Sequence, residues 1–188
     1  TIEFGNTANA IKLGIGMVHQ HFTLAENLTV LENIIIGRQS IFSLSLPKRK
    51  ARMKILELSK RFGLPIDPDE IVANLSVSEK QRIEILKTLF LDCKLLILDE
   101  PTAALTPQET DALFSTIRNL IDSGLSVILI SHKLNEILAV SDRIIVLRNG
   151  SSVGEMDTNS AARENIAEMI VGKKIDYPKK TKTPRRSR

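Results

Sequence analysis

Residues 95–100 read Leu95-Leu96-Ile97-Leu98-Asp99-Glu100, an apolar run that ends in two carboxylates. Such a run, with no polar alternation, is typical of a central strand in a parallel sheet, because both faces of that strand are buried. The strand would bring Asp99 and Glu100 to the carboxyl edge of the sheet, where open α/β folds bind their ligands. The stretch therefore predicts an α/β domain with a mainly parallel sheet.

Helices are predicted on both sides of this strand. Ser76-Val77-Ser78-Glu79 and Thr106-Pro107-Gln108-Glu109 each have the form of a capping box, in which a hydroxyl and a carboxylate satisfy each other's backbone N–H groups. Apolar periodicity predicts three more strands, at Leu13–Val18, Val127–Ile130 and Ile144–Leu147, and a hairpin turn follows the last of them at Asn149-Gly150. Periodicity and turn residues predict further helices at Thr29–Gly37, Pro47–Gly63, Lys133–Val140 and Ser160–Val171. The stretch up to Lys12 is expected to be irregular or strand-like.

Two of these features could carry chemistry. Asp99 could hold the magnesium ion of a nucleotide, and Glu100 could orient or deprotonate a water that attacks the γ-phosphate. A carboxylate pair of this kind is, on its own, more often a solvated strand end. A helix that begins at Ser76 offers free N–H donors to a phosphate, and it fits a plain helix cap equally well.

The order of these motifs resembles the ABC ATPase family. Its signature motif corresponds to residues 75–79, and its Walker B strand and D-loop correspond to residues 95–106. The resemblance implies a P-loop NTPase (RecA-like) core that binds ATP and Mg²⁺, with a helical subdomain at about residues 29–92. It further implies that Gln20 and Asp99 bind the magnesium ion and that Glu100 and His132 act in catalysis. The residues implied in nucleotide binding are Ser76, Val77, Ser78, Glu79 and Thr106. Of these, the signature residues would contact nucleotide across an interface with a second ATPase domain.

The resemblance can be narrowed to ABC proteins that import simple sugars and nucleosides. The stretches that carry it are residues 14–22, 81–87, 101–109 and 130–134. In that subgroup two ATPase domains share one polypeptide, and this chain is similar to the first. The resemblance implies an energy-coupling subunit at the cytoplasmic face of the cell membrane. Its partners would be the second ATPase domain, membrane-spanning permease subunits and, indirectly, an extracellular solute-binding protein.

The chain departs from the family pattern in two places. The phosphate-binding motif Gly-x-x-x-x-Gly-Lys-Ser/Thr does not occur in the 188 residues, and Ser78 stands where the family has glycine. Without that loop no backbone cradle orders the phosphates. We therefore expect a domain of residues 1–175 that lacks the N-terminal strands and the loop, and negligible ATP turnover by the isolated chain.

The formal net charge of +4 does not make the chain a nucleic-acid binder. Six basic residues and no acidic ones lie in 178–188, so the rest of the chain has a slight acidic excess. We interpret residues 176–188 as a basic linker or tail and expect no nucleic-acid partner. Two alternatives stay open: a soluble ABC-type ATPase of translation or chromosome maintenance, and a non-catalytic fragment that binds a partner protein.

Overall fold

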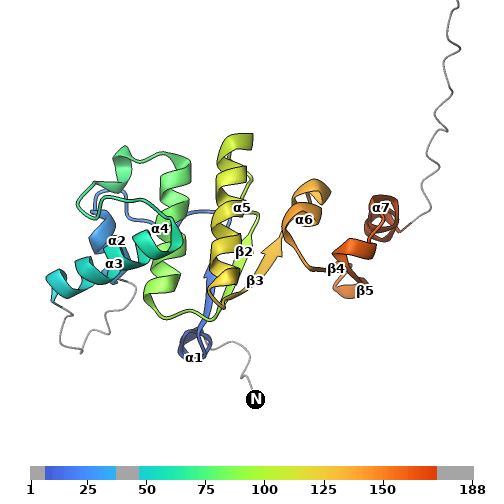
Figure 1. The fold of residues 1–188 in the computed structure, drawn as a ribbon, viewed down its shortest axis with the longest axis horizontal. Coiled ribbons are helices and arrows are strands. Elements are labelled where there is room, and N and C mark those ends of the chain that lie inside the picture. Colours follow the sequence, from blue (N-terminus) through green and yellow to red (C-terminus); the bar gives the residue numbers. More distant parts are fainter. Residues whose placement is uncertain (1–6, 37–46, 173–188) are drawn as a thin grey trace, which may run out of the picture. The chain divides into compact units, whose positions relative to one another are not determined.

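The computed structural model describes residues 7–36 and 47–172 (Figure 1). Gly37, the predicted end of a helix, and the predicted tail of residues 176–188 lie outside the described residues. The chain divides into two compact units, Thr1–Glu136 and Ile137–Arg188. The single domain expected for residues 1–175 stays a prediction.

A parallel sheet forms the centre of the first unit. Its strands are β1 (Ile15–Val18), β2 (Leu95–Asp99) and β3 (Ser126–Ile130), in the order β1-β2-β3. The register aligns Val18 with Leu98, and Leu98 with Leu129, so all three strands end at the same edge. The predicted parallel sheet is confirmed, with β2 as its central strand.

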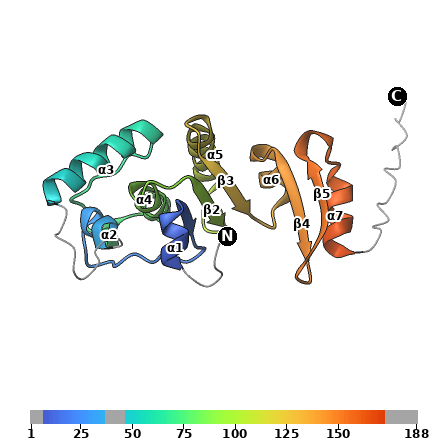
Figure 2. The ribbon, with the colours of Figure 1, turned by 90° about the horizontal axis from the view of Figure 1, so that it is seen from below.

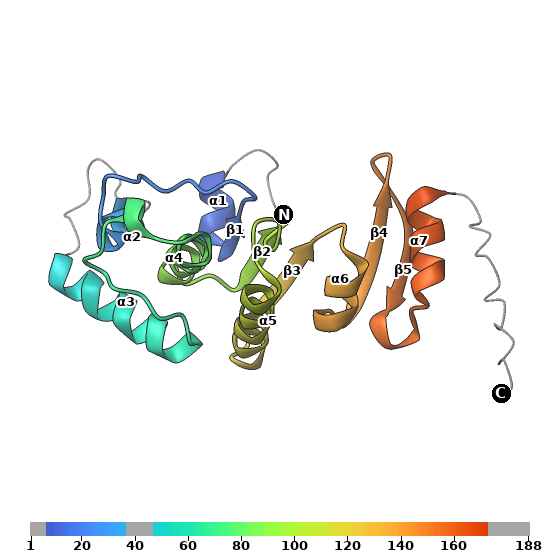
Figure 3. The same ribbon diagram turned by 90° about the horizontal axis from the view of Figure 1, so that it is seen from above.

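Helices α4 (Val77–Phe90) and α5 (Pro107–Asp122) lie on the same face of this sheet (Figures 2 and 3). On that face Leu96 and Leu98 of β2 are fully buried. The alternate residues point to the opposite face, where Met17 of β1 and Ile128 of β3 are 39% and 47% exposed. The sheet is therefore apolar on both faces, but these two helices cover only one.

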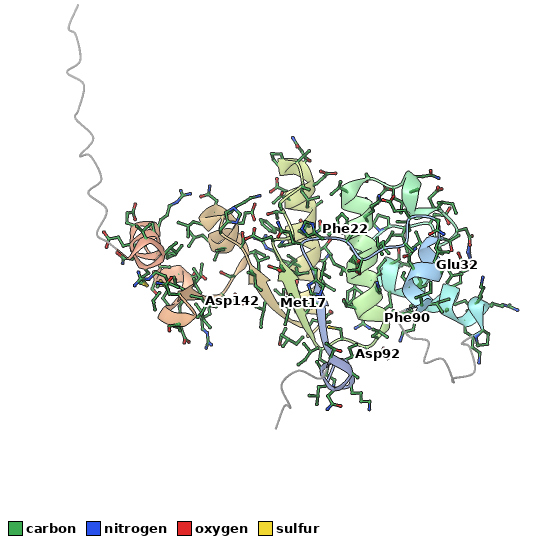
Figure 4. All side chains as sticks on the ribbon, turned by 180° about the vertical axis from the view of Figure 1, so that it is seen from behind. Met17, Phe22, Glu32, Phe90, Asp92 and Asp142 are labelled. Carbon is green, nitrogen blue, oxygen red and sulfur yellow. The ribbon has the colours of Figure 1, made fainter. Side chains whose placement is uncertain are left out.

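A group of helices packs beside α4 in the same unit. Helix α2 (Val30–Ile36) begins with a capping box between Thr29 and Glu32. Helix α3 (Lys48–Phe62) ends at Gly63, whose φ of 66° is the left-handed conformation that glycine adopts at low cost. Lys54 of α3 donates to the carbonyl of Phe90, 3.0 Å away, and to Asp92, 2.8 Å away, at the end of α4 (Figure 4). These contacts hold α3 against the C-terminus of α4.

The second unit is built on an antiparallel hairpin. Strands β4 (Arg143–Arg148) and β5 (Ser151–Asp157) are joined through Asn149-Gly150, as predicted, and both turn residues have positive φ, as a two-residue hairpin turn requires. Helix α7 (Arg163–Val171) packs on β4. The short helix α6 (Leu134–Val140) contains the point where the chain passes from the first unit to the second.

Two sequence predictions about elements are wrong. Residues before Lys12 were expected to be irregular or strand-like, but Thr7–Lys12 form α1, since the two alanines there favour a helix. The last helix was expected to begin at Ser160. Instead Thr158–Ser160 form a 3₁₀ turn, closed by the Ser160 hydroxyl bonding to the Asp157 carbonyl at 2.9 Å, and α7 begins at Arg163. No helix among the described residues is long and apolar enough to cross a membrane.

Candidate nucleotide-binding and hydrolysis site

Polar residues from three strands meet at the carboxyl edge of the parallel sheet. Gln20 lies two residues beyond the end of β1, Asp99 is the last residue of β2, and His132 lies two residues beyond the end of β3. The register aligns Asp99 with Ile130. Because parallel strands end at a common edge, the fold brings Gln20, Asp99 and His132 to the same side of the sheet.

Glu100 and His132 form a hydrogen-bonded pair at this edge. Nδ1 of His132 lies 2.7 Å from Oε1 of Glu100. Since an ionised carboxylate only accepts hydrogen bonds, Nδ1 carries the proton and Nε2 is left for another partner. The second carboxylate oxygen, Oε2 of Glu100, is buried and has no hydrogen-bond partner among the described residues. A free acceptor of this kind could receive a proton from a water molecule once the surrounding groups move to admit that water.

The oxygen donors at this edge suit magnesium. Asp99 supplies a carboxylate and Gln20 an amide oxygen, both of the hard oxygen type that Mg²⁺ prefers. In the described ranges, no group of three or more His, Cys, Asp or Glu side chains could hold a metal by itself. A magnesium ion here would therefore take most of its ligands from a bound phosphate and from water, which is how Mg²⁺ usually binds to proteins.

The start of α4 has the predicted capping box. The backbone N–H of Ser76 donates to Oε2 of Glu79 at 2.9 Å, and the N–H of Glu79 donates back to the Ser76 hydroxyl at 3.4 Å. Hydrogen bonds from the hydroxyl and then the N–H of Ser76 lower the pKa of Glu79. The hydroxyl of Ser78, the residue in place of glycine, lies 3.3 Å from the hydroxyl of Ser76.

Thr106 caps α5 in the same way. Its N–H and its hydroxyl both lie 2.9 Å from Oε2 of Glu109. The pKa of Glu109 is lowered first by the hydrogen bond from the Thr106 backbone and then by those from the hydroxyls of Ser78 and Thr106. Thr106 is therefore a helix cap, and its hydroxyl already has an acceptor.

Two further contacts connect α4 to the loops of the site. Gln81, in the second turn of α4, is buried and donates to the Pro101 carbonyl at 2.6 Å, directly after Glu100. Glu84, also buried, accepts from the N–H and the hydroxyl of Thr23 at 2.7 and 2.9 Å, in the loop that follows Gln20. Helix α4 thus holds both the loop after β1 and the loop after β2.

Sequence reasoning did not identify several polar residues that contact the loops of the candidate site: Gln81, Glu84, Thr102, Lys133 and Glu136. Most of them contact residues far away in the sequence, and a pattern read along the chain does not report such contacts.

Comparison with protein families decides the assignment. The sequence model of the ABC transporter family matches residues 2–103, more than half of the chain. The chain belongs to this family. This ABC chain is 47% identical over 170 residues to the nucleoside import ATP-binding protein NupA of Lactococcus lactis, and 43% identical over 204 residues to the glucose import ATP-binding protein TsgD13 of Haloferax volcanii.

The two alignments cover 90% and 93% of the ABC chain, but only 34% and 37% of the relatives. The chain therefore spans about a third of the length of the curated relatives that it matches. Among solved structures, it is similar to an ATP-binding cassette of an ABC transporter in its ADP conformation. The TM-score is 0.73 at 24% identity, with 88% of this chain and 71% of the cassette covered. The predicted fold class, an ABC ATPase core of the α/β type, is confirmed.

Proposed function

We propose that this ABC chain is part of the ATP-binding, ATP-hydrolysing component of an importer for simple sugars or nucleosides. The observation that carries the proposal is the Glu100–His132 pair at the carboxyl edge of the sheet, with a separation of 2.7 Å and a buried free oxygen on Glu100. Relatives named for nucleoside and glucose import support the substrate class.

In this proposal each site residue has a distinct role. Asp99 and Gln20 bind the magnesium ion that accompanies ATP, which neutralises charge on the phosphates. Glu100 accepts a proton from the attacking water through its free oxygen. His132 contacts the γ-phosphate when Nε2 is also protonated, so that Nδ1 donates to Glu100 and Nε2 donates to the phosphate. His132 thereby keeps Glu100 and the phosphate in a fixed relation, and positioning of this kind accounts for much of phosphoryl-transfer catalysis.

The signature residues act in a second site. Ser76, Val77, Ser78, Glu79 and Thr106 lie at or next to the N-termini of α4 and α5, where free N–H groups and the helix dipoles favour an anion. We propose that this surface contacts ATP held by a second ATPase domain. The hydroxyls of Ser76 and Ser78 lie 3.3 Å apart at the start of α4, where both could donate to a phosphate.

The proposed partners follow from the same assignment. They are a second ABC ATPase domain, membrane-spanning permease subunits and, through these subunits, an extracellular solute-binding protein. The helices between Gln20 and Leu75 would dock on the permease at the cytoplasmic face of the membrane. Residues 1–175 would form one nucleotide-binding domain, with residues 176–188 as its linker.

A chimera tests the proposed function. Residues 2–172 replace the matching segment of the L. lactis relative NupA, whose remaining sequence is kept. We expect the chimera to hydrolyse ATP in a magnesium-dependent manner and to support nucleoside uptake in cells that lack their own NupA. Glu100→Gln should keep ATP binding but lower turnover by at least about 100-fold, since it removes the proton acceptor.

The isolated 188-residue chain serves as the comparison and should show negligible turnover, because it has no Gly-x-x-x-x-Gly-Lys-Ser/Thr motif. A chimera that folds and binds ATP but hydrolyses none would contradict the proposal. Equal turnover in the chimera and in its Glu100→Gln variant would remove the role of Glu100 alone.

A further inference from the structure

Thr102 lies at the centre of a cluster of polar side chains, two residues after Glu100. The residue is fully buried, and its hydroxyl donates to Oε2 of Glu136 at 2.6 Å. Nζ of Lys133 donates to both the hydroxyl and the carbonyl oxygen of Thr102, each at 3.1 Å. One threonine thus joins the loop after β2 to residues that follow β3.

The cluster satisfies its own charges. Oε1 of Glu136 lies 3.1 Å from Nζ of Lys133, and Oε2 accepts from Thr102 and, at 3.4 Å, from the Ser131 hydroxyl. The same serine accepts from the backbone N–H of Lys133 at 3.1 Å. The side chain of Glu136 is only 12% exposed. In such a site, removing one partner is costly because the others lose their compensation.

The Glu100–His132 pair needs support from its surroundings. The side chain of His132 is 76% exposed, so little packing fixes the imidazole. Glu100 has a φ of 47°, a left-handed conformation that is unfavourable for residues other than glycine, asparagine and aspartate. Backbone conformations of this kind persist where neighbouring contacts hold them.

The cluster supplies contacts next to both members of the pair. Thr102 follows Glu100 by two residues, and Lys133 directly follows His132. The loop after β2 and the loop after β3 are therefore joined by two contacts: the hydrogen bond between Glu100 and His132, and the hydrogen bond from Lys133 to Thr102. On the other side, the bond from Gln81 to the Pro101 carbonyl holds the residue between Glu100 and Thr102. Residues 100–102 are therefore fixed by contacts from α4 and from the start of α6.

We propose that Thr102, Lys133 and Glu136 are positioning residues that hold the carboxylate of Glu100 against Nδ1 of His132. None of them is assigned a contact with nucleotide or metal. They act by fixing the two loops from which the pair projects. The inference rests on the proposed function for the pair's role in hydrolysis, but the geometry it claims can be measured without ATP.

The test reads the hydrogen bond of His132 in the 188-residue chain. The two ring nitrogens of a neutral imidazole give distinct ¹⁵N signals by NMR, so the spectrum reports which of them carries the proton. A free neutral imidazole favours the proton on Nε2, whereas the bond to Glu100 requires it on Nδ1. We expect a protonated Nδ1 in the wild-type chain, with the His132 signal assigned by its loss in His132→Gln.

Thr102→Val removes the hydroxyl at the same side-chain volume, and we expect the Nδ1-protonated form of His132 to give way to the Nε2-protonated form. Thr102→Ser keeps the hydroxyl and should restore the wild-type signal. Thr116→Val is the matched control, since Thr116 is also buried and donates to a backbone carbonyl, that of Ala112 at 3.1 Å, away from this cluster. It should leave His132 unchanged.

Glu136→Gln gives an independent reading if Thr102→Val does not fold, and it should produce the same change at His132. The proposal is overturned if a folded Thr102→Val or Glu136→Gln chain keeps His132 protonated on Nδ1, or if the wild-type chain lacks that form. Failure of the proposed function would appear differently, as a chimera without hydrolysis whose His132 signal still depends on Thr102.

Discussion

At the scale of single residues, the capping glutamates make stability depend on pH. Hydrogen bonds from Ser76 lower the pKa of Glu79 below its ordinary value of 4.5 in the folded chain. The folded state therefore holds its proton less tightly than the unfolded state does. The stabilisation is fully present above about pH 4.5 and is lost as the pH falls through the lower folded pKa.

Glu79→Gln should lower the free energy of unfolding at pH 7 by roughly 0.5–1 kcal/mol, since a neutral amide caps less well than a carboxylate at a partly exposed helix start. The difference from wild type should shrink as the pH falls below about 4.5, because wild-type Glu79 is then protonated as well. Urea unfolding at pH 7 and at pH 3.5 measures this. Glu57→Gln, on the exposed side of α3, is the matched control, and an equal pH dependence in both variants would contradict the assignment to the cap.

Gly16 shows why one position of β1 has no side chain. A Cβ added there would lie 2.9 Å from Cβ of Thr88, closer than real contacts allow, and 3.0 Å from Sγ of Cys93, which is tighter than most real contacts. Gly16→Ala should therefore destabilise the chain by about 1–3 kcal/mol, the usual cost of overpacking. The midpoint of urea unfolding measures the effect, and Cys93→Ala should reduce it in part by removing one of the close atoms. An unchanged midpoint would show that α4 can move away freely.

At the scale of elements, local signals predicted the helix starts well. Ser76 with Glu79 and Thr106 with Glu109 are read within four residues of sequence, and both capping boxes are present. The central strand was also predictable, because Leu95–Leu98 form a continuous apolar run of strand length between Lys94 and Asp99. By contrast, the bonds from Gln81 to Pro101 and from Thr102 to Glu136 join residues 20 and 34 positions apart, and no local pattern specifies them.

The contact between α4 and the loop after β1 depends on one buried carboxylate. Glu84→Ala would leave the N–H of Thr23 without its acceptor and would lose hydrogen bonds of 2.7 and 2.9 Å to a charged group. We expect a loss of roughly 1.5–3 kcal/mol in unfolding free energy and faster amide exchange at Thr23. Exchange followed by NMR measures the local effect.

Glu84→Gln is the control for this prediction, because its amide oxygen can still accept from the Thr23 N–H. It should lie between wild type and Glu84→Ala in both measurements. Protection of the Thr23 amide that stays at the wild-type level in a folded Glu84→Ala chain would show that Glu84 does not anchor the loop.

At the scale of the whole chain, the arrangement of site residues followed from topology more than from any motif. Gln20, Asp99 and His132 are far apart in sequence, and they share one edge because β1, β2 and β3 run parallel. The resemblance to the ABC ATPase family predicted a role in the site for each of these three residues. Their proximity has a physical cause in the sheet, whereas the 2.7 Å bond between Glu100 and His132 depends on side-chain geometry that the sequence does not report.

The open face of the parallel sheet governs how the isolated chain should behave in solution. Three apolar side chains on this face are exposed: Met17 by 39%, Ile128 by 47% and Ile130 by 44% (Figure 4). In the sheet register, Ile97 of β2 lies between Met17 of β1 and Ile128 of β3. A contiguous apolar strip on a parallel sheet is normally covered, since both faces of such sheets exclude water. We therefore expect the wild-type chain to self-associate as its concentration rises and to bind a hydrophobic dye.

Ile128→Lys separates this surface effect from stability. On the open face a lysine can extend into water, so association in light scattering and dye binding should both fall, while the unfolding midpoint changes little. Leu98→Lys makes the same kind of change on the covered face, where Leu98 is fully buried, and it should unfold the chain because the charge would be buried without a partner. If Ile128→Lys unfolded the chain as Leu98→Lys does, both faces of the sheet would have to be covered in solution, and the strip could not be the surface that drives association.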